Sequence, residues 1–186
     1  FCDGFNTDHL ALWDHLIEFG KPYGMQFSAS RAMTIRRIEG GIFGNLTDID
    51  TTITPFEAGL GYFVNMDKDF IGKDALIKKD KRTCLFGITC KTAVPKAGSK
   101  IKINDKHVGY ITAGVPSPTL QQGIGYVRFY EPNDYMNKEI EIILPDHSSH
   151  TGVVVDLPFF DKEKKIVKGI DRSIPIKPDS NSFDAK

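Results

Sequence analysis

The chain has 186 residues, of which 40% are hydrophobic and 26% are charged, the composition of an ordinary globular protein. Its 24 Lys and Arg residues balance its 24 Asp and Glu residues, so the formal net charge is zero. This balance gives no general attraction to nucleic acid or anionic lipid, and no apolar run approaches the ~20 residues that a membrane span requires. We therefore expect neither a nucleic-acid partner nor a membrane partner.

The first part of the chain has helical patterns. Apolar side chains recur at three- and four-residue spacings over residues 8–19, which predicts an amphipathic helix capped by Thr7 or Asp8. Residues 28–38 carry a weaker stripe with several β-branched residues, and we favour a helix there. Residues 60–64 predict a strand, and residues 69–79 predict a short helix.

From Thr83 onward the pattern changes to short β-type runs separated by Gly, Asn and Pro turns. The six runs are residues 84–90, 100–103, 107–112, 123–129, 139–144 and 152–157. Their spacing of roughly ten residues is typical of a β-barrel or a β-sandwich. A domain boundary is expected within residues 78–82. Residues 161–186, charged and then rich in Pro and Ser, are expected to form a tail extension on the surface.

Cysteine and histidine usage predicts a reduced protein without metal. The chain has an odd number of cysteines, Cys2, Cys84 and Cys90, and they lack a C-x-x-C spacing. We therefore expect free thiols in a reducing compartment, and a cytoplasmic location. The five scattered His residues do not supply the ligand set of a zinc site. Because the chain begins at Phe1 rather than Met, we expect a truncated or processed product.

Four groups of motifs occur in order along the chain. They are Arg37-Ile38-Glu39-Gly40-Gly41 with Phe43-Gly44; Thr54-Pro55-Phe56-Glu57-Ala58-Gly59-Leu60-Gly61-Tyr62; Asp69-Phe70-Ile71-Gly72-Lys73-Asp74-Ala75-Leu76; and Thr112-Ala113-Gly114, Ser117-Pro118-Thr119-Leu120, Ile124-Gly125-Tyr126-Val127 and Leu157-Pro158-Phe159-Phe160. This ordered set resembles the glycine cleavage T-protein family of folate-dependent aminomethyltransferases and its demethylase relatives.

The resemblance implies an α+β fold. Residues 1–80 would be the end of a ferredoxin-like α+β folate-binding domain, and residues 83–160 a distorted C-terminal β-barrel. It also implies an enzyme that transfers an aminomethyl or methyl group to tetrahydrofolate. The donor would be a small methylated amine or sulfonium compound, or a lipoyl carrier protein. In the family the catalytic Asp and the pterin-binding Glu precede the region matched here, so no catalytic residue is expected in this chain.

Seven residues are candidates for binding the folate cofactor: Arg31, Arg37, Glu39, Glu57, Tyr62, Ser117 and Phe160. Several have a structural alternative. Arg37 and Glu39 are two apart on a helix and do not face each other, so each could instead form a structural ion pair. Glu57 could cap a helix or strand end, Tyr62 could pack in the core, and Ser117 could serve a turn. Arg128 is expected on a solvated face or near an anionic folate tail.

One position departs from the family pattern. The run G-A-R-D-T-L-R-L-E carries an Arg that reaches toward the folate, and alignment on Arg37 and Glu39 places Met33 there. This departure favours a relative that demethylates another donor, such as dimethylglycine or dimethylsulfoniopropionate, over glycine cleavage itself. Two alternatives stay open: a non-catalytic folate-binding module of the same fold, and the folate domain of a flavin-dependent amine oxidase.

Overall fold

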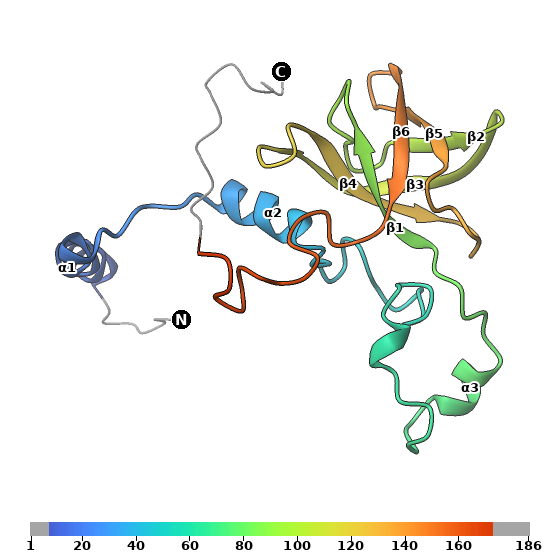
Figure 1. Cartoon of the computed structure of the whole chain (residues 1–186), viewed down its shortest axis with the longest axis horizontal. Helices are drawn as coiled ribbons and strands as arrows, with labels where there is room; N and C mark the ends of the chain where they lie inside the picture. The colour runs from blue at the N-terminus through green and yellow to red at the C-terminus, as the bar shows by residue number, and fades with distance from the viewer. Residues whose placement is uncertain (1–7, 173–186) are drawn as a thin grey trace. The chain divides into compact units, whose positions relative to one another are not determined.

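The computed structural model describes residues 8–172, so the expectations for Cys2, Thr7 and residues 173–186 lie outside the described residues (Figure 1). The chain divides into two compact units, residues 1–33 and 34–186. The domain limits expected at residues 80 and 83 stay a prediction.

The first unit contains helix α1 (His9–Gly20), which confirms the helix predicted over residues 8–19. The Asp8 carboxylate caps it, because one oxygen accepts the backbone N–H groups of Leu10 and Ala11 at 3.0 Å each. A 3₁₀ turn, η1 (Lys21–Tyr23), follows it. No residue of α1 is buried, and Trp13 stacks on Phe27 with ring centroids 5.2 Å apart.

Helix α2 (Ser30–Glu39) begins in the first unit and ends in the second, and it confirms the helix favoured over residues 28–38. A long loop with one 3₁₀ turn, η2 (Gly61–Phe63), and the short helix α3 (Lys73–Ile77) connect it to the sheet. The strand predicted at residues 60–64 is therefore wrong. The backbone bonds there are local, from Phe63 to Leu60 and from Val64 to Gly61, so the segment never needs a neighbouring strand.

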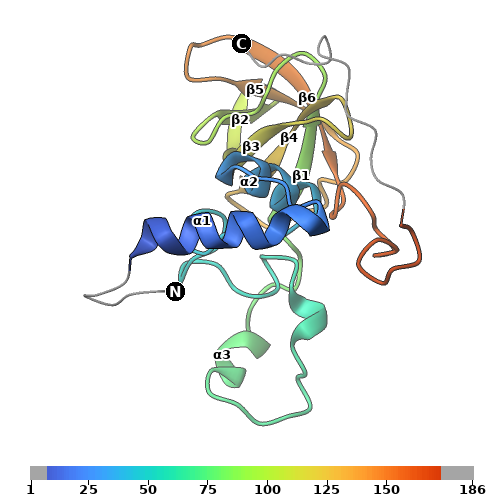
Figure 2. The same ribbon diagram turned by 90° about the vertical axis from the view of Figure 1, so that its left-hand side faces the viewer.

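All six predicted β runs form strands of one closed antiparallel barrel (Figure 2). They are β1 (Leu85–Cys90), β2 (Lys100–Ile103), β3 (Lys106–Ser117), β4 (Gln122–Phe129), β5 (Glu139–Ile143) and β6 (Ser149–Val155). Their order around the barrel is β1-β4-β3-β2-β5-β6, and pairing of β1 with β6 closes it. Closure leaves no unpaired sheet edge, and the α+β class with a barrel is confirmed.

The barrel interior is apolar. Its buried residues include Ile88, Ile101, Ile111, Ile142 and Val154, together with Phe86, Phe129 and Tyr135. Cys84 and Cys90 are both buried in this cluster as free thiols, as expected of two residues on one face of a strand. Each fully buried Ile stabilises the fold by roughly 1.5–3 kcal/mol, so this cluster is the main source of stability in the second unit.

Strand β3 is longer than the predicted run, which stopped at Thr112. The register with β4 shifts between Ile111 and Ala113, so Ile111 and Thr112 are both buried and the alternation of the sequence is broken there. Gly114 lies just beyond the shift. A side chain at that position would collide with the carbonyl oxygen of Pro95, which explains why the residue is glycine.

A second apolar cluster packs the end of α2 against the outside of the barrel. Its buried members are Ile38, Leu85, Val115, Ile124 and Tyr126, with Phe43, Leu157 and Phe159 packed on them. Figures 1 and 2 show α2 beside the barrel. This junction brings the family-like motifs from distant parts of the chain together.

Candidate functional site

Asp48 is the centre of a buried polar network at the junction of α2 and the barrel. Only 1% of the residue is exposed. Its carboxylate accepts hydrogen bonds from Arg37 Nη1 at 2.9 Å, from the backbone N–H of Gly44 at 2.7 Å and from Thr112 Oγ1 at 2.6 Å. A buried carboxylate is tolerated only with such compensation, so this network joins the loop after α2 to strand β3.

Glu39 and Ser117 form a second buried link. The hydroxyl of Ser117 donates to Glu39 Oε1 at 2.6 Å, and Arg36 Nη1 lies 3.1 Å from Oε2. Ser117 Oγ also accepts the backbone N–H of Leu120 at 3.0 Å. The last turn of α2 is thereby tied to the end of β3.

Tyr126 supplies the third link, from strand β4. Its hydroxyl lies 3.2 Å from the carbonyl oxygens of Ile38 and Ile42, and its ring packs edge-on against Phe43 and stacks on Phe159. Burial raises the pKa of this hydroxyl, and the nearby charge of Asp48 raises it further, so it stays a proton donor. The carbonyls at the end of α2 therefore have a partner away from water.

An apolar cavity of about 620 Å³ opens beside this junction. Its walls come from the loop after α2, strand β1, strand β6 and the segment that follows β6. The apolar side chains among them are Phe43, Ala58, Leu60, Phe63, Leu85, Phe86, Met136, Val155, Leu157 and Pro158. The lining is completed by the glycines Gly40, Gly41 and Gly59 and by the side chains of Thr83, Asp156 and Lys164.

Glycine at position 41 lets the chain pass close to one wall of this cavity. Gly41 has a φ of 70°, a left-handed conformation, and a Cβ there would lie 3.0 Å from Pro158 Cα. A side chain at this position would push the two walls apart. The backbone around Gly41 is further fixed because Lys164 Nζ donates to the carbonyl of Gly40 at 3.3 Å.

Four of the seven candidate residues meet at the end of α2: Arg37, Glu39, Ser117 and Phe160. The backbone N–H of Phe160 donates to the carbonyl of Glu39 at 3.0 Å. Glu39 and Ser117 are buried against each other, whereas the side chain of Arg37 is 27% exposed. Within residues 8–172, Arg37 bonds only through Nη1, so Nε and Nη2 could meet an anionic ligand.

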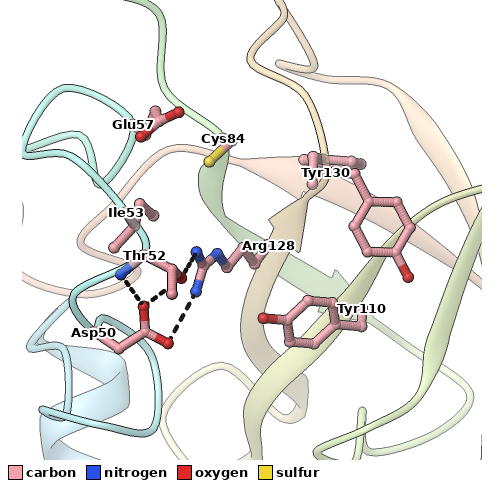
Figure 3. A pocket seen from close by; sticks show the side chains of 9 residues that line it. Asp50, Thr52, Ile53, Glu57, Cys84, Tyr110, Arg128 and Tyr130 are labelled. Atoms are coloured by element: carbon pink, nitrogen blue, oxygen red, sulfur yellow. Dashed lines mark hydrogen bonds and ion pairs between the residues drawn. The ribbon is translucent and has the colours of Figure 1, made fainter. Parts of the chain in front are cut away.

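The other three candidates lie elsewhere. Glu57 Oε2 accepts the backbone N–H of Thr54 at 2.7 Å, and its side chain lines a separate polar cavity (Figure 3). Tyr62 is 95% exposed, so its alternative as a core residue is wrong, and its neighbour Phe63 lines the apolar cavity. Arg31 is exposed and belongs to the first unit. As ligands of folate, all seven remain predictions.

Sequence reasoning missed Asp48, Thr112 and Tyr126 as a connected set. Asp48 lies in a polar loop that carried no signal of burial, and its partner Thr112 is 64 residues away. The family-like motifs contained Thr112 and Tyr126, but their contacts follow only from the fold. Residues 8–172 hold no group of three or more His, Cys, Asp or Glu side chains able to bind a metal. Nor does any helix in this range have the length and apolarity to cross a bilayer.

Comparison with known proteins agrees with this architecture. Residues 5–68 match the family model described as the GCVT N-terminal domain, and residues 81–161 match the glycine cleavage T-protein C-terminal barrel domain. An aminomethyltransferase of Caldanaerobacter subterraneus subsp. tengcongensis is 34% identical over 175 residues, covering 88% of this chain and 46% of that protein. One from Alkaliphilus oremlandii is 40% identical over 123 residues, covering 62% and 33%.

Among solved structures, the glycine cleavage system aminomethyltransferase T from Bartonella henselae superposes with a TM-score of 0.67. Its sequence identity is 23%, and the match covers 81% of this chain and 43% of that one. At this identity the likeness concerns the fold alone. The chain spans about half the length of the curated relatives it matches, or less.

Proposed function

Because this chain belongs to the glycine cleavage T-protein family, we propose that the native polypeptide containing it transfers a one-carbon unit to tetrahydrofolate. In this proposal the residues of this chain form part of the folate site and supply no catalytic group. The one-carbon unit is an aminomethyl or a methyl group, as in the family.

The apolar cavity is the observation that carries the proposal. Its volume of about 620 Å³ lies in the range of ~300–1,000 Å³ that is usual for small-molecule sites. Phe43, Phe63 and Phe86 offer apolar surfaces to a flat ring system, and the backbone carbonyl groups of Gly40 and Gly41 offer hydrogen-bond acceptors at its edge. This combination of aromatic side chains and polar backbone groups suits a heteroaromatic ligand that carries a charged tail.

The chemistry of transfer needs a water-free and well-positioned ligand more than a reactive side chain. Tetrahydrofolate supplies the nitrogen that accepts the one-carbon unit. The aromatic walls would exclude water from the ring. Lys164 lines the cavity and would attract the anionic part of the ligand. Arg37 does not line it, and in this proposal its free N–H groups bind the part of the anionic tail that extends beyond the cavity. We further propose contributions from the other candidates, with Glu39 and Ser117 acting by holding the end of α2.

The donor in this proposal is a small methylated amine or sulfonium compound rather than a lipoyl carrier protein. Met33, 66% exposed, stands where the family run has an Arg, so the side chain expected to reach toward the folate is absent at that place. The proposed setting is the cytoplasm, which keeps Cys84 and Cys90 reduced.

Calorimetric titration of the native polypeptide with 5-formyltetrahydrofolate tests the site. Val155 lines the apolar cavity, so Val155→Trp fills it and should weaken binding at least tenfold. Val153→Trp is the matched control, because Val153 is two residues away on the same strand and face, is equally half-buried and does not line the cavity.

A folded native polypeptide that gives no binding heat would contradict folate as the ligand. Equal binding by the two Trp variants would reject this cavity as its site. Turnover assays with dimethylglycine, dimethylsulfoniopropionate and the aminomethylated lipoyl carrier then identify the donor, and binding without any turnover would favour a non-catalytic folate module.

A further inference from the structure

A polar cavity of about 240 Å³ lies where the loop around residues 50–57 meets strands β3 and β4 (Figure 3). Its lining side chains are Asp50, Thr52, Ile53, Glu57, Cys84, Tyr110, Arg128, Phe129 and Tyr130. None of them lines the apolar cavity proposed for folate. The two cavities are therefore separate sites on the second unit.

Arg128 forms the positive end of the polar cavity. Its side chain is only 15% exposed, so the expectation of a solvated face was wrong. Nη2 donates to Thr52 Oγ1 at 2.7 Å, and Nη1 lies 3.5 Å from Asp50 Oδ2. A guanidinium has five N–H donors in a planar fork, and these two contacts leave enough of them to bind a carboxylate.

Asp50 holds Arg128 in place without saturating it. Asp50 Oδ1 accepts both the backbone N–H of Thr52 at 2.8 Å and its hydroxyl at 2.5 Å. These bonds to Thr52 lower the pKa of Asp50, and the charge of Arg128 lowers it further, so the carboxylate is ionised at neutral pH. Arg128 is thus a fixed cation with donors to spare.

Glu57 forms the negative end. Its Oε2 is used by Thr54, while Oε1 makes no hydrogen bond with any residue in the range 8–172. Burial raises the pKa of the Cys84 thiol to about 11; the charge of Glu57 acts in the same direction and that of Arg128 opposes it. Both charges therefore act on one neutral thiol, which Figure 3 places between them. The cavity is polarised along this line.

Two tyrosines form an aromatic wall near Arg128. The rings of Tyr110 and Tyr130 are 6.1 Å apart and tilted by 38°. Tyr130 is 62% exposed, which leaves the cavity open to solvent. Aromatic faces attract ammonium groups and pack against N-methyl groups. With Asp50 and Glu57 negative and Arg128 positive, the formal charge of the lining is one negative.

We propose that this cavity binds a small zwitterion, an α-amino acid or its N-methylated derivative. The carboxylate pairs with Arg128 and the ammonium group faces Glu57 and the tyrosine rings. A simple carboxylate would pair with Arg128 but leave the net negative charge of the lining unneutralised, and a simple cation would leave Arg128 without a ligand anion. The proposal does not rest on folate binding, since the residues involved lie outside the apolar cavity.

Calorimetry on the native polypeptide tests this with four probes: glycine, N,N-dimethylglycine, acetate and dimethylammonium. We expect saturable binding of the two zwitterions and at least tenfold weaker binding of the two singly charged probes. Arg128→Gln and Glu57→Gln should each weaken N,N-dimethylglycine at least tenfold. Arg82→Gln is the control, because Arg82 is an exposed arginine paired with Asp80 outside the cavity, and it should change nothing.

Several results would overturn the proposal. One is a folded protein that binds neither zwitterion, and another is acetate binding as tightly as N,N-dimethylglycine. If zwitterion binding survives both Arg128→Gln and Glu57→Gln, the zwitterion binds outside this cavity, for example at the site of the one-carbon donor. Circular dichroism melts show whether each variant is folded, and the near-isosteric Glu57→Gln decides the matter if Arg128→Gln does not fold. Val155→Trp, which fills the apolar cavity and does not line the polar one, should weaken 5-formyltetrahydrofolate binding but leave glycine binding unchanged, so the two proposals fail separately.

Discussion

Replacing Thr112 by Val should show how much the buried network around Asp48 stabilises the fold. Valine keeps the shape of threonine and removes only the hydroxyl that donates to Asp48 Oδ1 at 2.6 Å. Asp48 is 1% exposed, so water cannot replace the lost donor. A hydrogen bond to a buried charged acceptor is worth about 1.5–3 kcal/mol, and we expect a loss of about 2 kcal/mol.

Urea unfolding followed by circular dichroism measures this loss. With a urea m value of about 2 kcal/mol/M, a loss of about 2 kcal/mol lowers the midpoint by about 1 M without changing the m value. Thr151→Val is the matched control, because Thr151 is an exposed threonine on β6 and its replacement should change stability by less than about 0.5 kcal/mol. If the two variants unfold at the same urea concentration, the Asp48 network does not stabilise the junction.

Three further changes test other parts of the structure. Tyr126→Phe removes the hydroxyl that serves the carbonyls of Ile38 and Ile42 and should cost about 1–2 kcal/mol in the same urea assay; an unchanged midpoint would contradict the third link. Gly87→Ala places a Cβ 2.9 Å from Leu157 Cδ2 and from the ring of Phe159. It should lower the free energy of unfolding by about 1–3 kcal/mol and weaken 5-formyltetrahydrofolate binding. Wild-type values for both would show that Leu157 and Phe159 move aside without cost. Burial raises the pKa of Cys84 to about 11, so in a Cys2→Ser/Cys90→Ala variant iodoacetamide should not label this thiol at pH 8 until urea unfolds the protein. Rapid labelling of the folded variant would refute its burial. Because the folded state holds the thiol proton more tightly than the unfolded state, stability should also fall as the pH rises from about 8.5 toward 11.

The barrel could be predicted from the sequence because its signal is local. Alternating apolar residues between turn residues mark each strand, and all six runs became strands. The same rule failed where geometry departs from alternation. The shift between Ile111 and Ala113 hid the second half of β3, and the run at residues 60–64 looked like a strand although its backbone bonds close locally.

The candidate site was only partly predictable, because its contacts join residues far apart in the chain. Motif positions directed attention to Arg37, Glu39 and Ser117, but the sequence does not say that Ser117 lies on Glu39, 78 residues away. The family-like motif pointed to Tyr62, whereas its neighbour Phe63 faces the cavity. In a 3₁₀ helix, neighbouring side chains point in directions about a third of a turn apart. A loop this short has no hydrophobic periodicity that would show which of the two side chains faces the cavity.

A crystal structure of the native polypeptide with bound 5-formyltetrahydrofolate would show whether the apolar cavity beside α2 binds the cofactor. We expect the pterin ring inside the cavity walled by Phe43, Phe63 and Phe86, with the anionic part of the ligand paired to Lys164 at the cavity or to Arg37 beyond it. Folate bound with its ring against other residues, and this cavity filled by protein side chains instead, would contradict it.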